Sequence, residues 1–211
     1  MTTVEWFRKY VCGNLHRKIM PRLLIIIAAM TSTVSGFAQA DITVYSFADA
    51  RIMKDKMAIK RLSLADVVSE EKFVPVAVRD FRNLEVLILR PHPTRFGRPL
   101  GGGLCIVGYP KTKIASLPSW IGELRALSKV DLIGVTNFNY SRELKKLVDL
   151  PELSELSIDP DEFNDQLAET LVQFKKLKSL KIRATLTEEQ QVILAKALPN
   201  CELVTGIYAN Y

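Results

Sequence analysis

Apolar residues recur in the middle of the chain with a spacing that changes within each segment. In residues 116–134, "SLPSWIGELRALSKVDLIG", leucine-class side chains stand at Leu117, Ile121, Leu124, Leu127, Val130 and Leu132. The first positions lie three or four apart, as on a helix, whereas Val130 and Leu132 alternate, as in a half-buried strand. A change of period within a segment indicates that the chain changes direction there. A change of direction that recurs at a fixed interval predicts a coil of repeats.

The same change from helix-like to strand-like spacing recurs along the chain at a nearly constant interval. Residues 73–89 repeat it closely, and the frame continues through 147–158, 171–182 and 198–204. Residues equivalent to Leu124 follow at 150, 174 and 198, so the pitch is 26, 24 and 24 residues. One such turn cannot hide its leucines alone, so we expect turns that stack and share a core.

The pattern resembles the leucine-rich repeat family, whose unit of about 20 to 29 residues contains L-x-x-L-x-L. The resemblance covers 57–205 and is most specific at 117–127, where the chain reads L-P-x-x-I-G-x-L-x-x-L. It implies an α/β solenoid, a short curved right-handed coil with a parallel sheet on its concave face and helical or irregular segments on its convex face. The family usually has asparagine three residues after the second leucine of L-x-L; this chain has Val67, His92, Val135, Asp161 and Thr185 there.

The first 40 residues follow a different pattern. Five basic residues and one acid precede the apolar run 23–30, and the segment ends in Ala38-Gln39-Ala40. This layout is typical of a secretory signal peptide, so we predict cleavage near Ala40 and a secreted, periplasmic or cell-envelope protein. Translation from Met20 would also leave a complete leader. The apolar run is far shorter than the roughly 20 residues of a spanning helix, so we expect membrane contact only through the leader during export.

The leader also carries most of the net charge. The whole chain has a charge of +6 from 29 basic and 23 acidic residues. Without the leader, which holds +4, the remaining 171 residues hold only +2. Nucleic-acid binding needs a clustered basic face, and no cluster of this kind stands out in the sequence, so we expect no nucleic-acid partner.

The remaining chain divides into caps and repeats. We expect residues 41–56, with a short helix, to form an N-terminal cap; Ser46–Ala50 resembles the S-x-x-x-A openings of secreted bacterial members of the family. Residues 57–205 would form about six repeats, the last with a helix at about 187–197 and a final strand. Residues 206–211 would form a C-terminal cap.

One interval is longer than the others. Leu84 and Leu127 are 43 residues apart, about 18 more than one turn, which identifies 91–113 as an insertion. Its three consecutive glycines and four prolines exclude a regular helix. The insertion is a binding loop, a mobile excursion without a binding role, or a degenerate extra turn with "LCIVG" as its strand.

Residues that carry catalytic chemistry are scarce. His92 is the only histidine beyond the leader, and Cys105 in the same insertion could act with it as a hydrolase dyad. No orienting residue is evident, so we expect no enzyme, no cofactor and no catalytic residue. Cys105 and Cys201 could pair in an oxidising compartment, although Cys201 occupies a leucine position and is better explained as a core residue.

An acidic segment follows the fourth repeat. Its carboxylates could hold calcium through oxygen ligands; they are Asp159, Asp161, Glu162 and Asp165. The segment lacks the central glycine of a calcium loop, and an acidic helix start is the simpler explanation. We therefore expect no metal site.

The strongest functional candidate is a surface. Side chains alternate along a strand, so the residues between the inward leucines should line the concave face. This predicts a binding face that includes Val86, Ile88, Arg90, Lys129, Asp131, Ile133, Glu155, Asp159, Lys181 and Arg183. Exposed Val86, Ile88 and Ile133 beside mixed charges would suit another protein or a peptide better than a phosphate or a sugar. The alternative is a structural or envelope-associated module without a dedicated ligand.

Overall fold

The computed structural model of this protein describes residues 44–92, 94–96, 106–108, 110 and 112–206. The predicted leader and residues 207–211 of the predicted C-terminal cap lie outside them. Contacts divide the chain into two units, Met1–Ile42 and Thr43–Tyr211. The fold below is that of the second unit.

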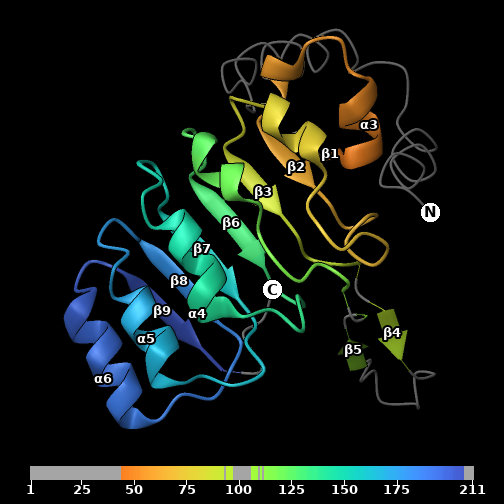
Figure 1. The fold of residues 1–211 in the computed structure, drawn as a ribbon. Coiled ribbons are helices and arrows are strands. Elements are labelled where there is room, and N and C mark those ends of the chain that lie inside the picture. The colour runs from red at the N-terminus through yellow and green to blue at the C-terminus, as the bar shows by residue number, and fades with distance from the viewer. Residues whose placement is uncertain (1–43, 93, 97–105, 109, 111, 207–211) are drawn as a thin grey trace, which may run out of the picture. The chain divides into compact units, whose positions relative to one another are not determined.

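Seven parallel strands form one sheet, which confirms the expected α/β class (Figure 1). The strands are, in spatial order, β1 (Tyr45–Ser46), β2 (Arg61–Ser63), β3 (Val86–Ile88), β6 (Lys129–Leu132), β7 (Glu155–Ile158), β8 (Ser179–Ile182) and β9 (Glu202–Thr205). Each strand pairs with the next strand of this sheet along the chain. The chain therefore crosses back outside the sheet between strands.

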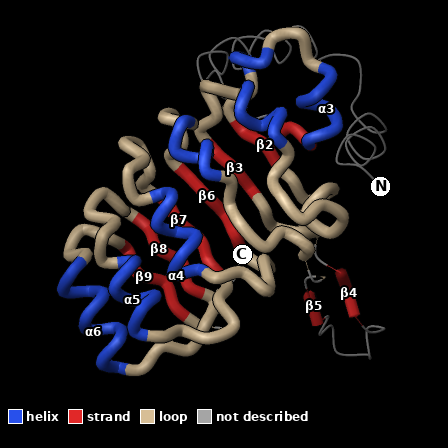
Figure 2. Tube along the Cα trace, viewed as in Figure 1, coloured by secondary structure: helices blue, strands red, loops and turns tan. Residues whose placement is uncertain are grey.

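The crossings contain short helices on one side of the sheet (Figure 2). They are α3 (Phe47–Ile52), α4 (Tyr140–Glu143), α5 (Asp165–Leu171) and α6 (Glu188–Ala197), with 3₁₀ turns at Lys56–Ala58, Val76–Asp80, Ser119–Glu123 and Leu144–Leu147. Helix α6 matches the expected helix at 187–197. It begins at a capping box, because the Thr187 side chain accepts a hydrogen bond from the Gln190 amide while the Gln190 side chain accepts one from the Thr187 amide.

The register of the strands agrees with the predicted alignment of leucines. Leu87 pairs with Val130, Val130 with Leu156, and Leu156 with Leu180. Leu62 pairs with Leu87 at the start of this alignment. We call these five aligned residues the leucine column, and each of them is at most 1% exposed. Helical leucines such as Leu167, Leu171 and Leu194 belong to the same buried cluster. Neighbouring turns therefore bury one another's apolar side chains in a shared core.

Residues 41–56 do more than the predicted cap requires. The segment contains the expected short helix, α3, and also β1, which pairs with β2 through Tyr45–Leu62 and Ser46–Ser63. The Ser46 side chain caps the start of α3 by accepting a hydrogen bond from the Asp49 amide. This segment thus adds a strand to the sheet.

The insertion at 91–113 is not an extra turn of the coil. Strands β4 (Thr94–Phe96) and β5 (Ile106–Gly108) pair antiparallel in a two-stranded sheet of their own. Strand β3 pairs directly with β6. The degenerate-turn alternative is therefore wrong, because the strand within "LCIVG" does not join the main sheet.

None of the helices in the described part of the chain combines the length and the apolar character needed to cross a bilayer.

Candidate binding face

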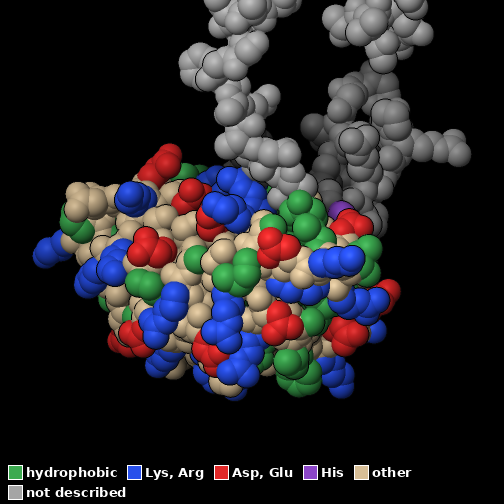
Figure 3. Space-filling view, turned by 90° about the horizontal axis from the view of Figure 1, so that it is seen from above, with side chains coloured by type: hydrophobic (Ala, Val, Ile, Leu, Met, Phe, Trp, Pro, Cys, Tyr) green, Lys and Arg blue, Asp and Glu red, His purple; other side chains and the backbone are tan. Residues whose placement is uncertain are grey.

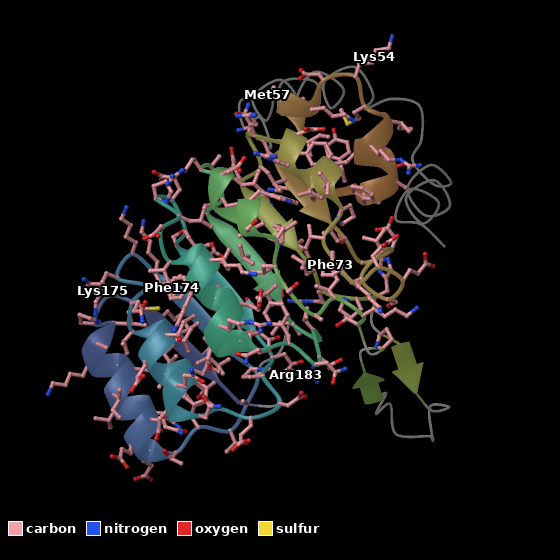
Figure 4. The ribbon with its side chains drawn as sticks, viewed as in Figure 1. Lys54, Met57, Phe73, Phe174, Lys175 and Arg183 are labelled. Atoms are coloured by element: carbon pink, nitrogen blue, oxygen red, sulfur yellow. The ribbon has the colours of Figure 1, made fainter. Side chains whose placement is uncertain are left out.

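Six of the ten predicted binding residues lie in strands, on the side of the sheet opposite the leucine column, and the other four follow strands within two residues. We call this side the helix-free face, because the described helices lie on the other side of the sheet (Figure 2). Strand pairing arranges its side chains in rows across the sheet. The first row is Arg61, Val86, Lys129, Glu155, Ser179 and Glu202, and the second is Ser63, Ile88, Asp131, Ser157, Lys181 and Val204. The remaining predicted residues, Arg90, Ile133, Asp159 and Arg183, lie two residues beyond the second row, in the segments that follow the strands (Figure 4 labels Arg183). The six strand residues of the predicted set thus share one side of the sheet.

The expected exposed aliphatic residues are mostly buried. Val86 is 8% exposed and Ile133 is 0% exposed, so the expectation of exposure is wrong for both; Ile88 is half-buried. Neither Val86 nor Ile133 belongs to the leucine cluster. Ile133 follows β6 in a turn rather than in the strand, so strand alternation does not determine its exposure.

Three ion pairs connect charged side chains of the helix-free face. Arg90 Nη2 lies 2.5 Å from Asp131 Oδ2, and Lys129 Nζ lies 2.7 Å from Glu155 Oε2. The third pair joins Arg183 Nη1 to Asp159 Oδ2 at 3.2 Å. Each pair links neighbouring strands or the turns that follow them, so the charges fix one another's positions across the sheet.

The buried carboxylates also hold the turn after β6. Asp131 Oδ1 accepts a hydrogen bond from the Ile133 amide at 3.1 Å. Asp159 Oδ2 accepts one from the Gly134 amide at 3.0 Å, across the next turn of the chain. Gly134 has a φ of 77°, a conformation in which a Cβ is strained. Two amides of the turn after β6 are therefore satisfied by the Asp131 and Asp159 carboxylates.

Tyr140 supports the same turn, and the sequence analysis did not identify it. Its hydroxyl lies 2.9 Å from the Val135 carbonyl oxygen and 3.1 Å from that of Leu132, and it accepts a hydrogen bond from the Asp159 amide at 3.3 Å. Burial raises the pKa of the Tyr140 hydroxyl, so the group stays protonated and donates to a carbonyl. A tyrosine side chain from the following helix thus bonds to the backbone of this turn. In the sequence, the only indication of this role is a tyrosine that follows a predicted strand.

Opposing effects act on the Asp159 carboxyl. Burial is the largest and raises its pKa, while the charge of Arg183 and the hydrogen bond from the Gly134 amide lower it. The net result is a pKa above the ordinary value of 3.8. The Asp159 carboxyl therefore takes up a proton at a higher pH than an ordinary aspartate does.

The alternative chemistries find little support among the described residues. No group of three or more His, Cys, Asp or Glu side chains there is arranged to hold a metal ion. His92 is exposed, and Cys105 lies outside the described residues. Cys201 is a free thiol that is half-buried against the core, so the disulfide alternative is wrong and its explanation as a core residue agrees with the structure.

A pocket of about 270 Å³ lies elsewhere, between two neighbouring crossings. It is lined by Val148, Asp149, Leu150, Leu153, Gln173, Phe174, Lys175 and Lys176. Figure 4 labels Phe174 and Lys175 there. Lys176 Nζ donates to the Pro151 carbonyl oxygen at 3.0 Å, which ties the two crossings together. The pocket contains no member of the helix-free face.

Charges of both signs are mixed on the surface. On the face drawn in Figure 3, Lys and Arg side chains alternate with Asp and Glu and with small apolar areas. Such a mixture differs from the continuous basic face of a nucleic-acid-binding protein.

No protein-family model matches this chain, and no curated protein matches it significantly.

Proposed function

We propose that this chain is an exported leucine-rich repeat protein that binds another protein or a peptide through its helix-free face. In this proposal the parallel sheet is the concave side of a right-handed solenoid, and the leader directs the protein to the envelope or the exterior. The proposal draws support from the repeated pitch in the sequence and from the side-by-side register of Leu87, Val130, Leu156 and Leu180.

The observation that carries the proposal is the breadth of the helix-free face. Seven strands about 4.8 Å apart span roughly 29 Å, and six of them contribute side chains to its first row. A surface of this width with charges of both signs fits a macromolecular partner better than a small molecule, which needs an enclosed site. The cross-strand ion pairs hold those charges in place before binding, which lowers the entropy lost on association.

Two exposed ion pairs of equal separation allow a matched test, although Arg79 contacts both oxygens of its partner Glu123. Lys129–Glu155 lies on the helix-free face at 2.7 Å, with side chains 37% and 47% exposed. Arg79–Glu123 has the same separation of 2.7 Å, with 49% and 46% exposure, but joins two 3₁₀ turns of the crossings. Removing either exposed pair should change folding by less than about 1 kcal/mol.

The experiment begins with a partner recovered by affinity capture from the envelope or secreted fraction of the producing cells. Its affinity is then measured by calorimetry for the wild type and two double variants. We expect Lys129→Ala with Glu155→Ala to weaken binding by about tenfold or more, and Arg79→Ala with Glu123→Ala to leave it unchanged. Equal affinities for all three proteins would reject the helix-free face as the binding site and favour the structural-module alternative.

Export and catalysis are tested separately. N-terminal sequencing of the protein from the producing cells should begin at Asp41. Full-length chain starting at Met1 would contradict the predicted leader. The hydrolase alternative requires His92, so any turnover that His92→Ala abolishes in a folded protein would favour an enzyme instead.

A further inference from the structure

The two ends of the seven-stranded sheet differ from the strands between them. The column residues from Leu62 to Leu180 are at most 1% exposed, whereas Tyr45 in β1 and Leu203 in β9 are aligned with them and only half-buried. Among the described residues, β1 pairs only with β2 and β9 only with β8. Each end thus presents backbone groups and part of a core side chain, and an open edge strand is a template for pairing with another chain.

The two edges have complementary hydrogen-bonding patterns. At five of the six junctions, from β2–β3 to β8–β9, the first helix-free-face residue of the later strand donates its amide to the carbonyl just before the earlier strand, at 2.8 to 3.0 Å; the donors are Val86, Lys129, Glu155, Ser179 and Glu202. Residues in line with the leucine column donate the other way, as Leu64 does to Ile88 and Leu89 to Asp131, both at 2.8 Å. When this alternation is continued to the two edges, the outward amides are those of Leu203 and Thr205 on β9, that of Ser46 on β1, and that of Val44 just before β1. The free edge of β9 therefore has the donors and acceptors that each strand presents to the next strand of the sheet. The free edge of β1 has those that each strand presents to the preceding strand.

The two ends also carry opposite charge. Residues 44–61 hold five basic and two acidic side chains, a net charge of +3. Residues 186–206 hold one basic and three acidic side chains, a net charge of −2. Figure 4 shows Lys54 extending away from the ribbon at the first end. A two-fold contact between two β9 edges would bring acidic ends together, whereas contact between unlike ends brings opposite charges together.

Exposed aliphatic side chains accompany both terminal turns. Ile52 and Met57 are exposed in the first turn, and Val192 and Ile193 on α6 in the last. Isolated exposed aliphatics are common on protein surfaces. They add apolar area near both edges but do not determine which edge pairs with which. The hydrogen-bonding patterns and the charges of the two edges determine that.

We propose that copies of this chain stack head to tail, with β9 of one copy pairing in parallel with β1 of the next and Leu203 beside Tyr45. The contact would continue the sheet, the leucine column and the helix-free face across the junction. Because each copy contributes a different end, the interface is heterologous, and it closes into a ring or continues as a filament.

Two variants that each block one edge test this arrangement. Val44→Pro removes an outward amide next to β1, and Thr205→Pro removes one on β9; by the pattern above neither amide donates to a neighbouring strand. The purified full chain should form a concentration-dependent series of oligomers in analytical ultracentrifugation, stronger at low salt because the ends are oppositely charged. Each variant alone should be monomeric. An equimolar mixture should form a one-to-one dimer and nothing larger, because only one intact β9 edge meets one intact β1 edge.

Other outcomes would overturn the proposal. A wild type that stays monomeric at high concentration and low salt would do so. A Val44→Pro variant that still dimerises alone would indicate a two-fold contact between β9 edges instead. Association that persists in both variants would locate the interface elsewhere.

A second pair of substitutions leaves the backbone unchanged. Arg51→Glu with Lys54→Glu makes the first end acidic and should weaken association, and adding Glu188→Lys with Glu189→Lys should restore it. Failure of the second pair to restore association would contradict the pairing of unlike ends. Thermal unfolding and circular dichroism establish that each variant is folded before its association is measured.

Discussion

Glu143 Oε2 accepts a hydrogen bond from the Leu117 amide at 2.9 Å, across the boundary between two neighbouring turns. Lys146 Nζ lies 2.6 Å from the same carboxylate and donates to the Leu117 carbonyl oxygen at 2.5 Å. Both backbone polar groups of Leu117 are therefore satisfied by one ion pair of the following turn, in which Glu143 is buried and Lys146 is partly exposed. Although burial opposes ionisation, the hydrogen bonds from Lys146, Arg142 and Leu117 together lower the pKa of Glu143.

Removal of this carboxylate should be costly. Glu143→Ala leaves the buried Leu117 amide without its acceptor, and a buried donor left unsatisfied costs about 1 to 3 kcal/mol. Urea unfolding measures the loss. Glu123→Ala is the control, because it breaks the exposed pair with Arg79 and should cost less than about 1 kcal/mol. Equal losses of stability for the two variants would contradict the role of Glu143 in holding the Leu117 backbone.

The Asp159 carboxyl should make part of the stability depend on pH. Its pKa in the folded protein is raised above the ordinary 3.8, so between these values the folded state binds more protons than the unfolded state. The contribution of Asp159 to the free energy of unfolding is therefore present in full at low pH and is lost as pH rises through the folded-state pKa. The free energy of unfolding, measured from below pH 3.8 to above the folded-state pKa, should contain this pH-dependent contribution in the wild type but not in Asp159→Asn. A carboxyl carbon titration by NMR with a midpoint at or below 3.8 would contradict this expectation.

Gly134 should resist substitution more than a glycine in an ordinary conformation. Its φ of 77° strains any residue with a Cβ, and we expect Gly134→Ala to lower the free energy of unfolding by about 1 to 2 kcal/mol. Gly122 is the matched control, since a Cβ there would meet only the Lys146 carbonyl oxygen at 3.7 Å. Gly122→Ala should be near neutral. Similar effects of both substitutions would argue against strain at Gly134.

The leucine column should be the most sensitive part of the core. Leu156 is 1% exposed between Val130 and Leu180, so Leu156→Ala removes contacts to both neighbouring turns and should cost about 2 to 5 kcal/mol. Val192 is 64% exposed on α6, and Val192→Ala should change stability by less than about 0.5 kcal/mol. Chemical denaturation distinguishes the two. A small loss for Leu156→Ala would mean that the turns do not share one core.

The order of strands and the column of leucines could be read from the sequence, because apolar periodicity is set by burial and each turn repeats it. The strand β1 could not, since its two residues are too few for a period. The pairing of β4 with β5 was also missed, because glycine and proline exclude a helix without specifying which strands meet.

The strand residues of the helix-free face were predicted in their membership but not in their burial. Alternation along strands identifies which residues share a face, so Lys129, Asp131 and Glu155 were correctly predicted to lie together. Alternation contains no information about contacts across strands. It therefore predicted neither the burial of Val86 and Ile133 nor the bond that the Tyr140 hydroxyl accepts from the Asp159 amide after the next strand.

The most direct measurement of the central claim is lysine footprinting of the protein alone and in complex with its captured partner. Lys129 has a partly exposed side chain on the helix-free face, and Lys145 is exposed on a 3₁₀ turn of a crossing. If the helix-free face binds the partner, acetylation of Lys129 falls strongly in the complex while that of Lys145 stays the same. Protection of Lys145 with Lys129 unchanged would contradict the account.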